Sequence, residues 1–307
     1  MFWTTYAFKG RIFMKKILFE GCATAIATPF TESGVNYEEF GRLIDFQIEQ
    51  GIDALVVCGT TGESATMTDD ERKETFSFAI KKISKRVPVI IGTGSNCTSS
   101  AIELTKYAES IGADGALVVT PYYNKATQSG LIEHYKAIAN STNLPIIVYS
   151  VPSRTGVNIL PKTCLELSKI PNIVAIKEAS GNLSQVAEIS SLCGDNLTIY
   201  SGNDDQILPI LSIGGKGVIS VLSNVAPKIT SKMVHDYLDG NFENAKKAQL
   251  ESIALIKALF CEVNPIPVKA ALNKLGFNMG NPRLPLTPLT EENMAVLENE
   301  MKNYGLI

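Results

Sequence analysis

Short apolar runs, rich in valine and isoleucine, recur along the chain, and each ends in small or polar residues. We count eight such runs, at residues 22–30, 53–62, 87–94, 115–123, 144–152, 172–180, 197–202 and 216–223. Their positions do not alternate between apolar and polar, which is typical of parallel strands covered on both faces. The pattern therefore predicts eight buried parallel β-strands.

Helical patterns separate these runs. Thr68 and Glu71 have the spacing of a capping box, and Phe76, Ala79 and Ile83 follow at helical intervals. Eight repeats of a strand followed by a helix predict an α/β fold, the (β/α)8 TIM barrel. An open doubly wound sheet is the alternative. It is disfavoured because eight is the number that closes a barrel and no G-x-G-x-x-G follows the first strand.

The same pattern divides the chain into three parts. Residues 1–16 are expected to be an N-terminal extension that need not be native, because residues 1–13 match no element and Met14 is an alternative start. Residues 17–226 are expected to form the barrel. Residues 227–307 are predicted to be a C-terminal helical region packed on the barrel.

The composition is that of an ordinary globular protein. Hydrophobic residues make up 45% of the 307 residues, charged residues 19%, and the net charge is −3. This charge gives no reason to expect nucleic acid or a membrane as a partner. The six cysteines are scattered without metal-ligand spacing, which favours a reduced, cytoplasmic setting. We therefore expect no metal and no cofactor.

A lysine, Lys177, stands at the tip of one predicted core strand. Strand side chains alternate, so Ile173, Ala175 and Lys177 are expected to share the face that lines the barrel interior. Burial there would lower the pKa of the amine, and a neutral amine forms a Schiff base with carbonyl compounds. The competing interpretation is a lysine that pairs with a carboxylate or reaches out to the barrel rim.

Other polar residues also follow strands, where barrel enzymes build their sites. Tyr149 is a candidate proton carrier, or else it fills the barrel mouth. Arg154 lies on a turn and suits a carboxylate, although most loop arginines are simply solvated. The GTTGE loop, residues 59–63, suits a small anion or is a plain turn. Both histidines, His134 and His235, fall in helical patterns and are expected to be structural.

Nine motifs occur in order along the chain. They are GTTGES (59–64), GTGSN (92–96), TPYYN (120–124), YSVPSRTG (149–156), IKEASGN (176–182), SGND (201–204), GGKGVISVLSNVAP (214–227), NPIPVK (264–269) and RLPLTPL (283–289). Together they resemble the dihydrodipicolinate synthase branch of the N-acetylneuraminate lyase superfamily. Family members are (β/α)8 barrels with a C-terminal helical region, usually homotetramers, so the resemblance implies the same architecture.

The resemblance also implies a reaction. Lys177 would form a Schiff base with pyruvate, and the resulting enamine would attack L-aspartate-4-semialdehyde to give 4-hydroxy-tetrahydrodipicolinate, on the path to diaminopimelate and lysine. Tyr149 would relay protons with Thr60 and Tyr123, the last of which comes from a neighbouring subunit in this family. Family members commonly have asparagine where this chain has Ser150, a change expected to leave the relay intact.

Binding roles follow from the same resemblance. Thr61 would hold the pyruvate carboxylate, and Arg154 would hold the semialdehyde carboxylate. Gly202 and Ile219 would line the pocket.

Some family members are inhibited by lysine, which binds at a dimer interface. The residues here that match this site are Ser64, Ala65, Asn96 and Tyr122. Sensitive members have histidines, or a basic substitute, and a glutamate at the positions of Asp69, Arg72 and Ser100. Without that acid the ammonium group of the effector would be desolvated and unpaired, which is costly. The sequence therefore predicts weak or no inhibition by lysine.

Three alternatives remain open. A sister enzyme that cleaves N-acetylneuraminate or a 2-keto-3-deoxy-sugar acid would share the lysine and the tyrosine, but Arg154 in SRTG favours the synthase. A non-catalytic barrel would form no adduct with pyruvate. A pyridoxal phosphate enzyme using Lys177 would be coloured.

Overall fold

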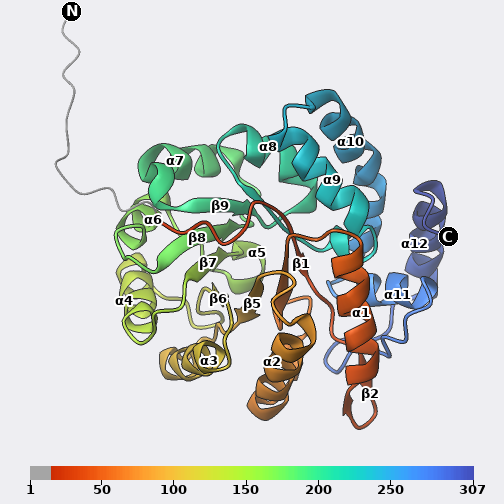
Figure 1. Cartoon of the computed structure of the whole chain (residues 1–307), viewed down its shortest axis with the longest axis horizontal. Coiled ribbons are helices and arrows are strands. Elements are labelled where there is room, and N and C mark those ends of the chain that lie inside the picture. The colour runs from red at the N-terminus through yellow and green to blue at the C-terminus, as the bar shows by residue number, and fades with distance from the viewer. Residues whose placement is uncertain (1–14) are drawn as a thin grey trace, which may run out of the picture.

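The architecture is a closed barrel of eight parallel strands (Figure 1). The computed structural model describes residues 15–307, so the expectations for residues 1–13 and Met14 lie outside the described part. The barrel strands are β1 (Gly21–Ala25), β4 (Ala54–Val57), β5 (Val89–Gly92), β6 (Gly115–Val119), β7 (Ile146–Ser150), β8 (Ile173–Glu178), β9 (Thr198–Ser201) and β10 (Gly217–Ser220). The predicted (β/α)8 TIM barrel is confirmed.

Helices surround the barrel and continue beyond its last strand. Those between the strands are α1 (Tyr37–Glu49), α2 (Asp69–Ile83), α3 (Thr98–Ser110), α4 (Gln128–Ala139), α5 (Pro152–Thr155), α6 (Pro161–Leu167), α7 (Leu183–Cys193) and α8 (Ile207–Ser212). The last four are α9 (Pro227–Leu238), α10 (Phe242–Leu259), α11 (Ile266–Lys274) and α12 (Glu291–Asn303). Figure 1 shows these four gathered on the side of the barrel that carries α1.

Smaller elements complete the chain. They are the antiparallel pair β2 (Phe30–Thr31) and β3 (Gly34–Val35) and the single turns η1 (Ser64–Thr66), η2 (Gly194–Asn196), η3 (Asp204–Gln206) and η4 (Leu222–Asn224). The predicted capping box is confirmed, because Thr68 Oγ1 accepts from the Glu71 N–H and Glu71 Oε2 accepts from the Thr68 N–H. It fixes the start of α2.

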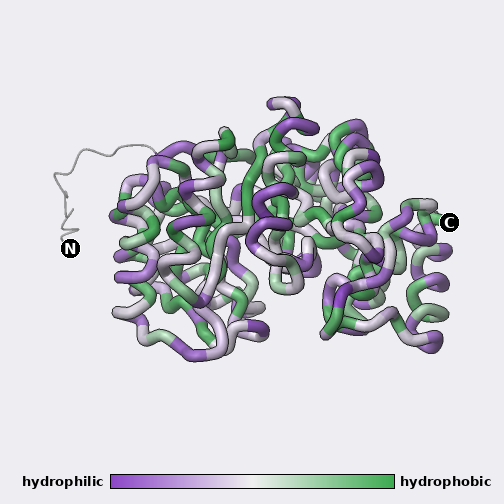
Figure 2. Tube along the Cα trace, turned by 90° about the horizontal axis from the view of Figure 1, so that it is seen from below, coloured by the Kyte–Doolittle hydropathy of each residue, from purple (hydrophilic) through white to green (hydrophobic). Residues whose placement is uncertain are grey.

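The core has two layers, as expected for strands covered on both faces. The larger layer lies between the strands and the helices, whose alternating apolar and polar segments are visible in Figure 2. The smaller layer fills the barrel interior. There Phe19 stacks on Tyr200 at 4.2 Å between ring centroids, and the Tyr200 hydroxyl donates to the Phe19 carbonyl. The residues before β1 therefore help to fill the barrel below the strand ends.

One prediction about strand β8 is wrong. Ile146 pairs with Ile173, but the next residue, Ile147, pairs with Ala175, so β8 carries an extra residue at this point. A bulge of this kind shifts the alternation of side chains. Ile173 consequently packs in the outer layer and Val174 in the inner one, whereas Ala175 lines the interior as expected.

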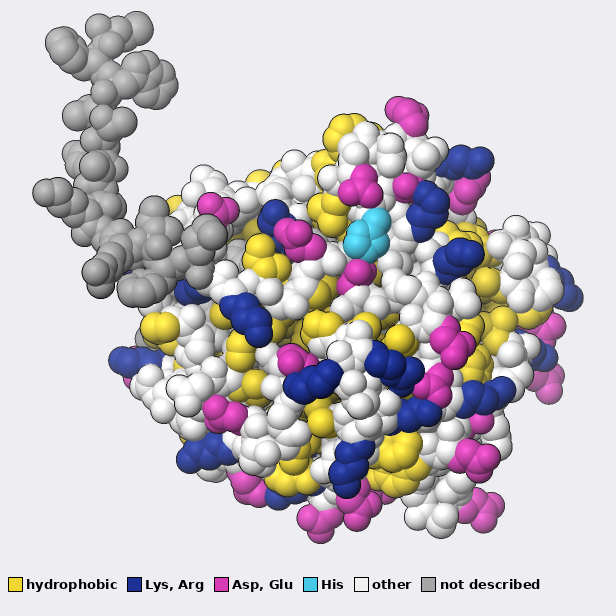
Figure 3. All heavy atoms as spheres, in the orientation of Figure 1, with side chains coloured by type: hydrophobic (Ala, Val, Ile, Leu, Met, Phe, Trp, Pro, Cys, Tyr) yellow, Lys and Arg dark blue, Asp and Glu magenta, His cyan; other side chains and the backbone are white. Residues whose placement is uncertain are grey.

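On the face drawn in Figure 3, acidic and basic side chains are interspersed and form no large patch of one charge. Within residues 15–307, no helix combines the length and the apolar character needed to cross a membrane.

Candidate active site

Lys177 lies inside the barrel near the end of β8, between Tyr149 on β7 and Tyr200 on β9, which are its register partners. The residue is only 5% exposed. Its Nζ lies 4.5 Å from the centroid of the Tyr149 ring. In the described part of the chain no carboxylate oxygen lies within 4.0 Å of Nζ. The amine is therefore buried, and no described residue forms an ion pair with it.

The surroundings of Lys177 favour its neutral form. Burial lowers the pKa of the amine to about 8; the charge of Arg154 acts in the same direction, whereas Asp204 opposes it. A lysine with this pKa carries an appreciable fraction of free amine near neutral pH. That is the form in which lysine attacks a carbonyl carbon.

Asp204 is a residue that sequence reasoning left without a role, although it stands in the SGND motif. It is buried, and its Oδ2 accepts from the backbone N–H groups of Val221 and Leu222, just after β10. Its Oδ1 has no hydrogen-bond partner in the part of the chain that the structure describes. An aspartate that follows the end of a barrel strand was the available signal. It places a negative charge in the neighbourhood of Lys177.

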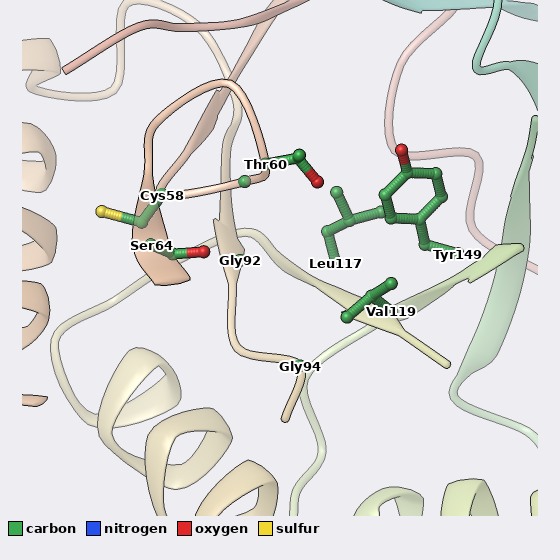
Figure 4. A pocket seen from close by; sticks show the side chains of 9 residues that line it. Cys58, Thr60, Ser64, Gly92, Gly94, Leu117, Val119 and Tyr149 are labelled. Carbon is green, nitrogen blue, oxygen red and sulfur yellow. The ribbon is translucent and has the colours of Figure 1, made fainter. Parts of the chain in front are cut away.

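Tyr149 and Thr60 face a common cavity, which Figure 4 shows with Ser64 and Val119 also lining it. Tyr149 comes from β7 and Thr60 from the loop after β4. Burial raises the pKa of the Tyr149 phenol, and the Arg154 charge and the Thr60 hydroxyl offset this only in part. The phenol is therefore protonated near neutral pH and able to donate a proton.

The GTTGE loop is more than a plain turn, because the C-terminal region holds it from two sides. Thr61 is 2% exposed, and its Oγ1 accepts from Asn264 Nδ2 at 2.9 Å. Glu63, in the left-handed region at φ +54°, forms a buried ion pair with Lys269, with 2.7 Å between Oε1 and Nζ. Sequence reasoning found Thr60 and Thr61 but missed these long-range partners.

Gly202 and Ile219 border the same interior. A Cβ added at Gly202 would lie 3.2 Å from Lys177 Cε and 2.6 Å from Ala179 Cβ, so only glycine fits beside the lysine. Ile219 is fully buried on β10 and packs with the interior residues. Gly202 therefore lies beside Lys177, and Ile219 lies in the interior layer that contains Tyr149 and Ala175.

Arg154 and Tyr123 lie further out. Arg154 is exposed on the single helical turn α5, and it makes no ion pair with any described residue. Tyr123 is 91% exposed, and it holds a φ of +74°, which is strained for a bulky residue. The described chain does not hydrogen-bond Tyr123 to Tyr149 or Thr60, so one subunit alone does not close the predicted hydroxyl chain.

The residues assigned to a lysine site lie at the loops after β4, β5 and β6. Ser64 lines the cavity of Figure 4, and Ala65 is exposed. Asn96 Nδ2 donates to the Tyr122 carbonyl at 3.5 Å. Ser150 does not point toward Lys177: its Oγ accepts from the Ile159 N–H, toward the outer layer.

Both histidines lie in helices, as predicted, and neither stands at the carboxyl end of a strand. His134 in α4 shares a hydrogen bond between Nδ1 and Thr98 Oγ1, and His235 in α9 contacts the Asp53 carboxylate through Nε2. Within residues 15–307, no group of three or more histidine, cysteine, aspartate or glutamate side chains is placed to hold a metal ion.

Comparison with known proteins agrees with this geometry. The model of the dihydrodipicolinate synthetase family matches residues 18–304. The chain belongs to this family. The predicted family is thereby confirmed, as is the prediction of an enzyme of the lyase class.

Individual family members are similar over nearly their whole length. The chain is 56% identical over 294 residues to the 4-hydroxy-tetrahydrodipicolinate synthase of Acetivibrio thermocellus, covering 96% of this chain and 100% of the relative. A solved dihydrodipicolinate synthase from Thermotoga maritima has 46% identity and a TM-score of 0.93, covering 95% and 100%. Another, from Acinetobacter baumannii and complexed with pyruvate, has 42% identity and a TM-score of 0.92, covering 94% and 99%.

Proposed function

We propose that the protein condenses pyruvate with L-aspartate-4-semialdehyde through a Schiff base on Lys177, to give 4-hydroxy-tetrahydrodipicolinate for lysine and diaminopimelate biosynthesis. The observation that carries this proposal is the buried amine of Lys177, which has a pKa of about 8 and no carboxylate within 4.0 Å among the described residues. The family and the names of the relatives support the choice of substrates. The Acinetobacter baumannii relative was solved with pyruvate.

The first half of the reaction uses groups inside the barrel. The neutral amine adds to the keto carbon of pyruvate, and loss of water gives the imine. Tyr149, beside Lys177, donates a proton to the departing oxygen. Removal of a proton from the pyruvate methyl group then gives the enamine. Thr61, in the GTTGE loop, binds the pyruvate carboxylate.

The second half brings in the aldehyde. The enamine carbon attacks the aldehyde carbon of the semialdehyde, whose carboxylate binds Arg154 at the barrel mouth. This arginine is exposed and has no ion-pair partner in residues 15–307, so its guanidinium is available for a bidentate contact. Cyclisation through the substrate amine then displaces Lys177 and releases the ring.

Tyr123 completes the proton relay from a second subunit in our proposal. Its side chain is almost fully exposed on a strained backbone, an arrangement that a single chain does not explain. We propose a homotetramer in which Tyr123 reaches the Tyr149 and Thr60 of a neighbouring copy. A cytoplasmic location without metal or cofactor remains our expectation.

Inhibition by lysine is proposed to be weak or absent. Asp69 is ion-paired with Arg72 at 3.4 Å, and Arg72 also donates to the Gly92 carbonyl, so both side chains already have partners within the chain. Ser100 supplies no charge for the effector's ammonium group. Strong inhibition by lysine at physiological concentration in a steady-state titration would contradict this.

The test combines adduct formation with substrate choice. Borohydride and pyruvate should add the mass of one reduced pyruvyl group per chain, and condensation should proceed with the semialdehyde but not with N-acetylmannosamine, the aldehyde of the sister lyase. Arg154→Ala should raise the semialdehyde KM at least tenfold while the pyruvate KM changes little. Cleavage of N-acetylneuraminate, or no mass gain, would reject the proposed reaction.

A further inference from the structure

Asn264, in the segment between α10 and α11, is a buried residue that none of the proposed steps uses. It is 5% exposed. Its Nδ2 donates to Thr61 Oγ1 at 2.9 Å, across 203 residues of sequence. Thr61 is the residue proposed to hold the pyruvate carboxylate. Asn264 therefore contacts the substrate-binding loop directly, from outside the barrel.

The direction of this hydrogen bond decides what Thr61 can do. A threonine hydroxyl has one proton to donate and two lone pairs that accept. The Asn264 amide nitrogen occupies one lone pair and cannot accept the hydroxyl proton, since an amide NH2 group only donates. The Thr61 proton is left for another acceptor, and a bound carboxylate is an acceptor without protons of its own.

The orientation of the Asn264 amide lowers the stability of the fold. Its Oδ1 is buried and has no hydrogen-bond partner among residues 15–307. Buried polar groups are nearly always paired, and an unpaired one lowers stability. An apolar side chain would avoid this cost, which indicates that the amide serves something other than packing.

Other residues of the C-terminal region contact Glu63, at the end of the same loop. Lys269 pairs with Glu63, and the Arg283 N–H donates to Glu63 Oε2 at 3.0 Å. The loop backbone at Thr61 is thus held between two contacts from residues after β10. The Thr61 hydroxyl can still rotate about its Cβ–Oγ1 bond, and the contact from Asn264 restricts this rotation.

We propose that Asn264 is a positioning residue that orients the Thr61 hydroxyl so that its proton is donated to the carboxylate of the keto acid. This inference rests on the proposed function, because it takes pyruvate as the occupant of the loop. It assigns to the C-terminal region a share in substrate recognition, through a residue that does not touch the substrate.

The test compares two substitutions at Asn264. In Asn264→Asp the new carboxylate accepts the Thr61 proton and turns it away from the substrate, so the pyruvate KM should rise more than tenfold. In Asn264→Ala the hydroxyl becomes free to rotate, so the rise should be smaller. The semialdehyde KM should change less than twofold in both. Asn244→Asp, the same change at an exposed asparagine of the C-terminal region, is the matched control and should behave as the unsubstituted protein.

A double-mutant cycle separates this role from simple charge repulsion. If Asn264 acts through Thr61, then Asn264→Asp should cost much less in a Thr61→Val background than in the original protein. Equal costs in the two backgrounds would overturn the inference. So would a pyruvate KM within twofold of the original in both Asn264 variants, which is the result expected if the amide is turned the other way and accepts from Thr61.

Borohydride trapping at several pyruvate concentrations distinguishes failure of the Asn264 inference from failure of the proposed reaction. If the original protein forms no pyruvyl adduct, the proposed reaction fails. If the original and the Asn264→Asp protein both label fully at saturating pyruvate, the reaction stands. The half-saturating pyruvate concentration then decides the inference, with a shift of more than tenfold expected and an unchanged value overturning it.

Discussion

The protein buries two lysines in similar surroundings but gives them different partners. Lys177 lies inside the barrel with Nζ 4.5 Å from the centroid of the Tyr149 ring, and Lys269 lies behind the GTTGE loop with Nζ 4.5 Å from the centroid of the Phe30 ring. Lys269 pairs with Glu63 at 2.7 Å. Lys177 has no such partner among residues 15–307.

The difference shows that burial alone does not mark a reactive amine. Burial lowers the pKa of both lysines, but Glu63 counteracts this at Lys269 through its charge and a hydrogen bond. A paired ammonium group has no free electron pair and serves stability. An unpaired amine is available to a carbonyl compound. The pairing therefore separates a structural lysine from the candidate catalytic one.

The largest expected effect comes from removing the unpaired amine. Lys177→Met should abolish condensation, because no other described group in the barrel interior supplies the imine nitrogen. The free energy of unfolding should stay the same or rise, since methionine fills the space without a buried polar group. Coupled assays and urea denaturation measure the two quantities. Residual turnover with the pyruvate adduct intact would remove Lys177 from the mechanism.

The same substitution at the paired lysine, Lys269, should lower the free energy of unfolding, which the Lys177 substitution should not. Lys269→Met leaves the buried Glu63 carboxylate without its ion-pair partner, with the Arg283 N–H as its remaining donor, which should cost about 3–5 kcal/mol of unfolding free energy. The double variant Glu63→Gln with Lys269→Met should recover part of this loss. Denaturation at fixed pH checks both. A stable Lys269→Met protein would mean that the ion pair does not hold the loop.

The aromatic partners offer a finer test. Tyr149→Phe gives Lys177 the same kind of neighbour that Lys269 has in Phe30, keeping the ring but losing the hydroxyl. Proton transfer by a positioned group contributes roughly a hundredfold or more. Turnover should fall by about this factor while pyruvate is still trapped by borohydride. If turnover is retained, the proton carrier is another group.

The pH dependence sharpens the comparison further. The free-amine fraction of Lys177 rises as pH rises through its pKa of about 8, so the initial rate of pyruvate trapping should increase about tenfold from pH 7 to pH 9. Asp204→Asn removes a charge that raises this pKa, so the midpoint should fall. Asp205→Asn, at the exposed neighbour, should leave it unchanged. A flat profile would contradict the titration of Lys177.

Much of the fold followed from local patterns. Parallel strands covered on both faces leave continuous apolar runs, so all eight strands could be predicted, together with the capping box before α2. Lys177 stood out because a lysine is seldom buried in a core strand, and Tyr149 because a phenol at a strand end can carry a proton. The bulge at Ile173 and Val174 could not be predicted, because it depends on the register with β7.

Long-range contacts explain what else was missed. The contact of Glu63 with Lys269 spans 206 residues, and that of Thr61 with Asn264 spans 203. Neither leaves a periodic signal in the sequence. Lys269 stands in the NPIPVK motif, but the sequence does not show that its partner is Glu63.

The most direct test of the central claim is peptide mapping of the protein after reduction with borohydride in the presence of pyruvate. The unpaired amine of Lys177 should carry the reduced pyruvyl group, and the peptide that contains Lys269 should be unmodified. An adduct on Lys269, an adduct on another lysine in place of Lys177, or no adduct at all would contradict the claim that pairing separates the two.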